Sequence, residues 1–149
     1  MAKRKDTTMK IMAIDYGDAR TGLAICDKTE FLAKPLPQIE EKSMMKVVDK
    51  IAQAAQEYSA EMLVLGLPRN MDGTEGARAQ KSRKLAGILE QKIEIPVKMW
   101  DERSTTVTAA GILTENGTFG KKRKGMLDSV SATVILDSFL AWRKNHPEE

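Results

Sequence analysis

The hydrophobic pattern near the N-terminus predicts strands joined by short turns. Apolar residues fill Ile11–Tyr16 and Thr21–Cys26, and the connecting segment "GDAR" has the length and the glycine content of a hairpin connection. A third extended piece, Phe31–Leu36, is predicted to end at Pro35 and Pro37, because proline interrupts strand pairing. Short connections make neighbouring strands antiparallel, so the chain is expected to begin with an antiparallel part of a sheet.

The hydrophobic period then changes to that of a helix. Within Glu40–Tyr58 the apolar residues that share one helical face are Met44, Val47, Val48, Ile51, Ala55 and Tyr58. Met62–Leu67 is a continuous apolar run, which is typical of a strand buried on both faces. The turn "NMDGTEG" opens a second helix, with Asp72 or Thr74 as its expected N-cap. The predicted core stripe of this helix is Ala79, Ser82, Leu85, Ala86 and Leu89.

The C-terminal third adds one strand and two helices. Val97–Trp100 is the expected fifth strand, and a short helix is expected from Ser104 or Thr105 to about Leu113. The segment "TENGTFGKKRKG" is predicted to be a flexible loop before a last helix over Met126–Arg143. Helical crossovers place the fourth and fifth strands parallel to the first. The chain is therefore predicted to be an α/β protein with a mixed five-stranded sheet, antiparallel in its first three strands and flanked by helices.

Composition is that of a soluble globular chain. Of its 149 residues, 42% are hydrophobic and 30% are charged, and no apolar run approaches the ~20 residues of a membrane span. A single cysteine, Cys26, permits no internal disulfide, so a cytoplasmic protein is expected. We expect one domain over residues 10–144, preceded by a basic flexible N-terminus (1–9) and followed by a polar tail (145–149).

The basic residues are unevenly distributed. Lys3–Lys5 and Lys121–Lys124 hold three and four of the 24 Lys and Arg, which leaves 17 basic residues against 21 acidic ones elsewhere. Two basic clusters on an otherwise acidic body indicate an electrostatic footprint for a polyanion such as nucleic acid. A frayed terminus and a solvated loop are the alternative interpretation.

Four acidic residues are expected near one edge of the sheet. Asp15 ends the first strand, Asp101 and Glu102 follow the fifth, and Asp128 lies in the first turn of the last helix. Ligands of such sheets gather at the carboxyl ends of the parallel strands. Asp101 and Glu102 are adjacent and point to opposite faces, so one of them is expected to join the cluster.

Converging carboxylates repel one another unless a cation lies between them or one of them takes up a proton. Hard divalent cations prefer oxygen ligands, and a pair of such ions stabilises the attacking and leaving oxygens of phosphodiester cleavage. Asp15 would be the central ligand, with the glycines of its turn allowing close approach of substrate. Taken singly, each acid also fits a turn, a surface ion pair or a helix start.

Four segments resemble one protein family in the right order. They are "IMAIDYGDARTGLAICD", "LVLGLPRNMDGTEGARAQKSRKLAGIL", "WDERSTTVTAAGIL" and "KKRKGMLDSVSATVILDSFL", which together cover nearly all of the chain from Lys10 to Trp142. They resemble the YqgF family, also called RuvX, whose members are pre-16S rRNA nucleases first described as Holliday junction resolvases. The resemblance implies a ribonuclease H-like fold and phosphodiester hydrolysis in the cytoplasm that depends on Mg²⁺ or Mn²⁺.

The resemblance also implies the site residues. The catalytic and metal-binding acids become Asp15, Glu102 and Asp128, with Asp101 as the alternate in second position. Related resolvases carry an acid at the end of the fourth strand, where this chain has Gly66-Leu67-Pro68. The second acid must therefore come from "DER", so the mechanism need not be strictly equivalent.

Candidate nucleic-acid contacts follow from charge and position. Arg20 and Arg103 are suited to holding a phosphate bidentately, or else to pairing with a neighbouring acid. Thr105 lies at an expected helix N-terminus, which favours anions. The basic loop is expected to clamp a nucleic-acid backbone through Lys121, Lys122, Arg123 and Lys124.

Three functional alternatives remain at the level of the sequence. The leading one is a nuclease for pre-16S rRNA, with the ribosomal small-subunit precursor as the partner that presents it. A resolvase of branched DNA would need a dimer for paired cuts, and a non-catalytic nucleic-acid-binding scaffold would need neither acids nor metal. An actin-like ATPase is disfavoured because 149 residues have room for one of its two domains. His146, the single histidine, lies in the polar tail and is a poor candidate for acid–base catalysis.

Overall fold

The helices and strands follow the order predicted from the sequence. A computed structural model describes residues 9–28, 33–102 and 127–146. Its elements are β1 (Ile11–Asp15), β2 (Arg20–Cys26), β3 (Ala33–Glu40), α2 (Met44–Glu57), β4 (Met62–Leu67), α3 (Ala77–Lys92), β5 (Val97–Asp101) and α5 (Leu127–Asn145). The short helix and the basic loop expected between Ser104 and Lys124 lie outside the described residues.

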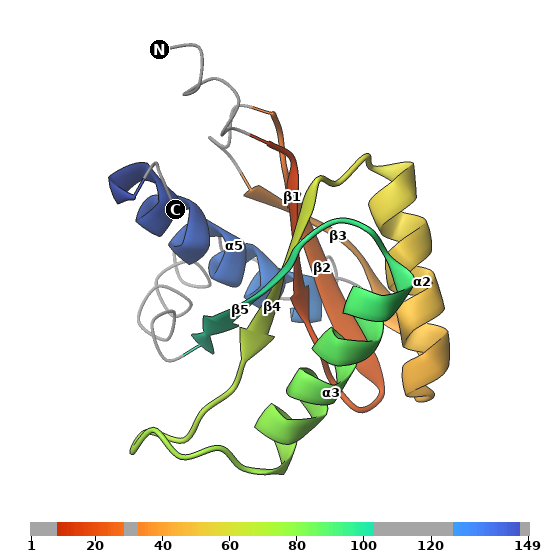
Figure 1. Ribbon diagram of the computed structural model, residues 1–149, viewed down its shortest axis with the longest axis vertical. Coiled ribbons are helices and arrows are strands. Elements are labelled where there is room, and N and C mark those ends of the chain that lie inside the picture. Colours follow the sequence, from red (N-terminus) through yellow and green to blue (C-terminus); the bar gives the residue numbers. More distant parts are fainter. Residues whose placement is uncertain (1–8, 29–32, 103–126, 147–149) are drawn as a thin grey trace.

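The sheet is mixed, as predicted. Its strand order is β3-β2-β1-β4-β5 (Figure 1). β2 pairs antiparallel with both β1 and β3, whereas β4 runs parallel to β1 and β5 runs parallel to β4. The carboxyl ends of the three parallel strands therefore meet at one edge of the sheet, which is the edge where we expect the acids.

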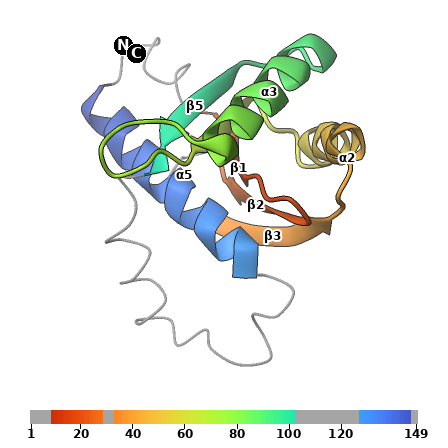
Figure 2. The ribbon, with the colours of Figure 1, turned by 90° about the horizontal axis from the view of Figure 1, so that it is seen from below.

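Helices cover both faces of the sheet. α2 and α3 lie on one face and α5 crosses the other (Figures 1 and 2). Alternation along β1 sends Met12 and Ile14 into the α2/α3 core and Ile11 and Ala13 into the α5 core. Every residue of β4 is buried, as the continuous apolar run predicted. None of the helices in the described ranges is long and apolar enough to cross a membrane.

The third strand is longer than predicted. Pro35 and Pro37 do not end it, because β3 continues from Ala33 to Glu40. β3 is an edge strand with one neighbour, and both prolines are exposed, so their missing amide hydrogens cost little pairing. The register of β2 against β3 also shifts between Thr21 and Leu23, which leaves Pro37 opposite an irregularity.

The start of α3 also differs from the prediction. Its N-cap is Gly76, without a side-chain hydrogen bond, and not Asp72 or Thr74. The Asp72 carboxylate instead accepts hydrogen bonds from the Thr74 amide at 2.9 Å and the Thr74 hydroxyl at 2.7 Å, so both residues stabilise the preceding loop. The predicted core stripe is confirmed, since the buried residues of α3 are Ala79, Ser82, Leu85, Ala86 and Leu89.

Candidate active site

Asp15 lies at the carboxyl end of β1, beside a turn that only glycine can make. It is half-buried and is the Cα partner of Gly22 in β2. Alternation along the strand places it on the α5 face together with Ile11 and Ala13. Gly17 follows in the turn, and a Cβ atom there would collide with the carbonyl oxygen of Arg20. The close return of the chain after Asp15 therefore depends on glycine at position 17.

Glu102 reaches the same face of the sheet from β5. The strand pairs Trp100 with Gly66 of β4, and Glu102 follows two residues after Trp100. A Cβ atom on Gly66 would lie 2.5 Å from Oε2 of Glu102 and 2.6 Å from Cδ1 of Ile135 in α5. The Glu102 carboxylate therefore occupies the space above Gly66, between β4 and α5.

Asp15 and Gly66 are neighbours in the sheet. The register of β1 and β4 pairs Ile14 with Leu65, and one further step along both strands sets Asp15 beside Gly66. The carboxylate of Glu102 lies over Gly66 of β4, the strand between β1 and β5, so Asp15 and Glu102 face the same side of the sheet. This is the convergence that the sequence predicted for the first two acids.

Asp101 forms an ion pair with Arg69 of the loop that follows β4. Its Oδ2 lies 3.7 Å from Nη1 of Arg69, and Nε of Arg69 lies 3.3 Å from Oε2 of Glu75. Glu75 in turn accepts two hydrogen bonds of 2.6 Å from Arg83 of α3. Asp101 thus belongs to an ion-pair chain that ties the β4–α3 loop to β5, which favours Glu102 as the second acid.

Burial shapes the electrostatics of Glu102. Desolvation raises the pKa of its carboxyl, the positive charge of Arg78 opposes that rise, and the negative charge of Asp101 adds to it. A cation bound between Asp15 and Glu102 would favour the ionised form of both.

The first turn of α5 is anchored beside Asp15. The amide of Leu23 donates a hydrogen bond of 3.1 Å to Oγ of Ser129, and this contact is buried. Leu23 follows Gly22, the Cα partner of Asp15. Asp128 precedes Ser129, so its backbone lies in the α5 turn that approaches this end of β1 and β2. The side chain of Asp128 lies outside the described part of the chain.

The other predicted contacts are only partly described. Arg20 begins β2 at the same edge and is exposed. Arg103, Thr105, Lys121, Lys122, Arg123 and Lys124 lie outside the described residues. Among the described side chains, to which that of Asp128 does not belong, no group of three or more His, Cys, Asp or Glu forms a metal site.

Cys26, Trp100 and Trp142 pack on the α5 side of the sheet. Cys26 is buried in the α5 core. Trp100 meets Phe139 edge-on with ring centroids 5.4 Å apart, and it meets Trp142 at 5.9 Å. The His146 ring stacks on Trp142 at 4.4 Å, so it extends this aromatic cluster, whereas a tail residue was expected.

Arg78 is a candidate that sequence reasoning missed. It is exposed in the first turn of α3 and lines a small hollow together with Tyr16, Gly17, Asp18 and Lys81. Its guanidinium acts electrostatically on Glu102, so it is close to both the turn after Asp15 and the second acid. Within the described ranges no ion pair involves Arg78, whereas Arg69 and Arg83 both pair with Glu75. In the sequence, "GARAQKSRK" offers no signal that separates Arg78 from an ordinary solvent-facing residue.

A family model and individual relatives place this chain in the same protein family. A family model for RuvX, described as Holliday junction resolvase, matches residues 9–142. A protein of Halothermothrix orenii named "Putative pre-16S rRNA nuclease" is 40% identical over 135 residues, which are 91% of this chain and 96% of that protein. A protein of the same name from Clostridium novyi is 35% identical over 132 residues, covering 89% of this chain and 98% of its own length.

The fold has a solved counterpart. The structure of Thermus thermophilus RuvC in complex with a Holliday junction substrate aligns with a TM-score of 0.62 at 12% identity, covering 90% of this chain and 96% of RuvC. That likeness shows the ribonuclease H-like fold that the resemblance implied. The match over nearly the whole chain, together with relatives at 35–40% identity, establishes that the protein belongs to the RuvX family.

Proposed function

We propose that this protein is a divalent-metal-dependent nuclease that hydrolyses phosphodiester bonds in the 5′-end processing of pre-16S rRNA. The observation that carries the proposal is that Asp15 of β1 and Glu102, which lies over Gly66 of the adjacent β4, face the same side of the sheet beside the first turn of α5. Asp128 in that turn is the proposed third acid. Cytoplasmic location and a single nuclease domain over residues 10–144 belong to the same proposal.

The acidic residues fit Mg²⁺ or Mn²⁺. All of the proposed ligands are carboxylates, which these hard cations prefer, and a nearby cation would oppose the rise in the pKa of Glu102 that burial causes. Asp15, Glu102 and Asp128 would hold the metal. When bound, such ions stabilise the charge that develops on the attacking and leaving oxygens of a phosphodiester.

The chain's own residues would bind and orient the substrate. Arg78 is placed to hold a phosphate oxygen beside the acids, because its guanidinium is exposed over the same hollow as the turn after Asp15. Arg20 and Arg103 would contact flanking phosphates, with Thr105 and the basic loop as further contacts. The loop residues are Lys121, Lys122, Arg123 and Lys124.

Relatives favour RNA over branched DNA as the substrate. Proteins named as pre-16S rRNA nucleases are 35–40% identical over most of the chain, whereas RuvC is 12% identical and shares the fold alone. The ribosomal small-subunit precursor is then the proposed partner. Cleavage of Holliday junctions is the second candidate, supported by the description of the matching family model.

A comparison of two substrates tests this proposal. Purified protein is incubated with a labelled pre-16S 5′ leader RNA or with a four-way DNA junction, each in Mg²⁺, Mn²⁺ or EDTA. We expect cleavage of the RNA in either metal and none in EDTA. Cleavage of the junction alone would favour the resolvase. Binding of either substrate without metal-dependent cleavage would favour the non-catalytic scaffold.

Replacement of Arg78 tests its proposed phosphate contact. A hydrogen bond to a charged group is worth about 1.5–3 kcal/mol, so Arg78→Ala is expected to lower kcat/KM about 10- to 100-fold. Arg78→Lys should recover part of this loss, because it restores charge without the bidentate geometry. The measurement is steady-state cleavage of the leader RNA.

The matched control is Lys84→Ala on the same helix. Lys84 is exposed and takes part in no ion pair with the described residues, so its removal changes net charge by the same amount. Its kcat/KM is expected to stay within about threefold of wild type. An equal loss in both variants would show that Arg78 acts through overall charge and not at the site.

A further inference from the structure

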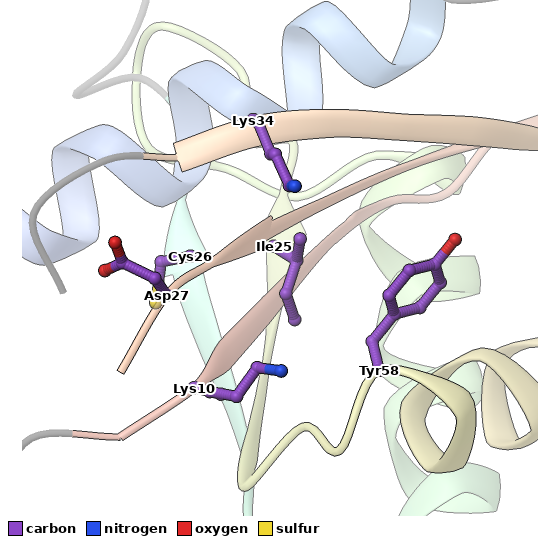
Figure 3. A pocket seen from close by; sticks show the side chains of 6 residues that line it. All are labelled: Lys10, Ile25, Cys26, Asp27, Lys34 and Tyr58. Atoms are coloured by element: carbon purple, nitrogen blue, oxygen red, sulfur yellow. The ribbon is translucent and has the colours of Figure 1, made fainter. Parts of the chain in front are cut away.

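A second hollow lies at the opposite end of β1 from the acids. Its volume is about 280 Å³, close to the lower end of the range for small-molecule sites. It is lined by Lys10, Ile25, Cys26, Asp27, Lys34 and Tyr58 (Figure 3). The α2/α3 core contains Ile25 and packs against Tyr58, so the hollow opens on the face opposite to Asp15 and Glu102.

The register of the sheet brings two lysines to this hollow. Ile25 of β2 pairs with Met12 of β1 on one side and with Lys34 of β3 on the other. Lys10 lies two residues before Met12 and therefore faces the same side of the sheet. Figure 3 shows the Lys10 and Lys34 side chains ending on either side of Ile25, with the Tyr58 ring facing them.

Within the described ranges, neither of these two ammonium groups forms an ion pair. This distinguishes them from Lys28, whose Nζ lies 2.9 Å from Oε1 of Glu61. Glu61 acts electrostatically on Lys10, but its carboxylate already accepts hydrogen bonds from Lys28 and from the Lys10 amide. The Asp27 carboxylate points away from the space between the two lysine tips (Figure 3). Two positive charges therefore face the hollow, and neither lies within ion-pair distance of a carboxylate among the described residues, although Glu61 is close to Lys10.

The remaining wall is suited to a planar, partly apolar group. Ile25 is 3% exposed and forms an apolar floor, and Tyr58 presents its ring at the end of α2. Free backbone carbonyls at the end of α2 would repel an anion. The carbonyls of Ala54, Ala55 and Gln56 are not free, because they accept hydrogen bonds from the amides of Tyr58, Ala60 and Ser59, respectively.

We propose that this hollow binds the phosphate group of a nucleotide, with Lys10 and Lys34 on the phosphate and the base or ribose against Ile25 and Tyr58. The nucleotide is either free or part of an RNA strand, and the strand form rests on the proposed function. Because the hollow opens on the α2/α3 face, a nucleotide held there is outside the reach of Asp15 and Glu102. The site would therefore hold a ligand without cleaving it.

Binding in EDTA tests the site separately from cleavage. Titrations use 5′-AMP as the free-nucleotide probe and a 12-nucleotide single-stranded RNA as the strand probe, each with full-length protein. Backbone amide NMR shifts of Ile25 and Lys34 report occupancy. The double variant Lys10→Gln/Lys34→Gln is expected to weaken binding of at least one probe about tenfold. If RNA is the ligand, the slope of log K against log salt should fall by about 0.7 for each phosphate that the variant no longer binds.

The control removes two lysines that are elsewhere on the α2/α3 side. Lys50→Gln/Lys92→Gln deletes side chains that lie 3.6 Å from Glu41 and Asp49, so net charge changes equally while the hollow stays intact. Its affinity for each probe should remain within about twofold of wild type. Weaker AMP binding by the first double variant assigns the site to free nucleotides, and weaker RNA binding assigns it to a strand.

The inference is overturned if the Lys10→Gln/Lys34→Gln variant binds both probes as wild type does, or if the control pair loses as much affinity. Its failure is distinguishable from failure of the proposed nuclease. Cleavage needs metal and is read from product formation, whereas occupancy of the hollow is read in EDTA. A protein that cleaves normally without the AMP or RNA effect loses only this site.

Discussion

Asp15→Asn is expected to abolish metal-dependent cleavage, lowering the single-turnover rate of leader RNA cleavage about 10³-fold in Mg²⁺ or Mn²⁺. Asparagine has the shape of aspartate, so the pairing of this position with Gly22 is retained and the fold should be unaffected. The neutral amide, however, replaces the carboxylate that is proposed as the central metal ligand. Loss of activity with an unchanged melting temperature is therefore the expected pattern.

The control and a second readout make this result specific. Asp49→Asn removes an equal charge from an exposed position on α2, 3.6 Å from Lys92, and should leave the cleavage rate within about twofold of wild type. Mn²⁺ binding, followed by electron paramagnetic resonance, should weaken in Asp15→Asn and not in Asp49→Asn. Cleavage by Asp15→Asn at the wild-type rate would show that Asp15 is not the central metal ligand.

Hydrophobic periodicity correctly predicted which residues of a single helix or strand are buried. All five residues of the predicted α3 stripe are buried, and β4 begins and ends where the apolar run does. In α2 the stripe residues Val47, Val48, Ile51 and Ala55 are buried, although the helix begins at Met44 and not at Glu40. The preceding strand β3 runs to Glu40, so pairing with β2 took precedence over helix propensity there.

Two local signals were interpreted incorrectly, the prolines of the third strand and the N-cap of α3. Proline interrupts a strand that pairs on both sides, but an edge strand tolerates it. The sequence alone did not show that β3 lies at the edge of the sheet. The N-cap of α3 was misplaced because Asp72 and Thr74 hydrogen-bond to each other in the loop. Both cases show a local signal that the surrounding structure used for a different purpose.

The sequence predicted where the acids gather, but it did not decide whether Asp101 or Glu102 joins Asp15. Alternation alone places Asp15 on the same side of its strand as Ile11 and Ala13, and the structure packs that side against α5. Asp101 and Glu102 are neighbours in sequence, so no pattern could decide between them. That decision depends on Arg69, which engages Asp101, and on Gly66, which leaves room for Glu102. Both contacts join segments that are more than thirty residues apart in the chain, and Arg78 was missed because it acts on Glu102 from a different element, α3.

Glu102→Gln is expected to lower the cleavage rate about 10²-fold, whereas Asp101→Asn should lower it less than about fivefold. The structure gives the reason for this difference. Glu102 lies over Gly66 beside Asp15, and Asp101 pairs with Arg69 away from that position. Single-turnover cleavage of the leader RNA by both variants measures it. The reverse order of effects would assign the second acid to Asp101.

Gly66→Ala tests the same arrangement without removing any charge. The added methyl group would lie 2.5 Å from Oε2 of Glu102 and 2.6 Å from Cδ1 of Ile135, so one or both side chains must move. We expect the cleavage rate to fall at least about tenfold and the free energy of unfolding to fall by about 1–3 kcal/mol. Urea denaturation and single-turnover cleavage separate the two effects.

A second glycine shows whether the loss comes from position or from the methyl group itself. Gly87 lies inside α3, and a Cβ atom there would meet no heavy atom within 4 Å. Gly87→Ala should therefore raise the free energy of unfolding by about 0.5–1 kcal/mol and leave cleavage unchanged. If Gly66→Ala were destabilised yet cleaved at the wild-type rate, the Glu102 carboxylate would not need its place over Gly66. Loss of cleavage in Gly66→Ala alone would instead mean that this glycine makes room for an acid from β5 at the position where related resolvases carry one on the fourth strand.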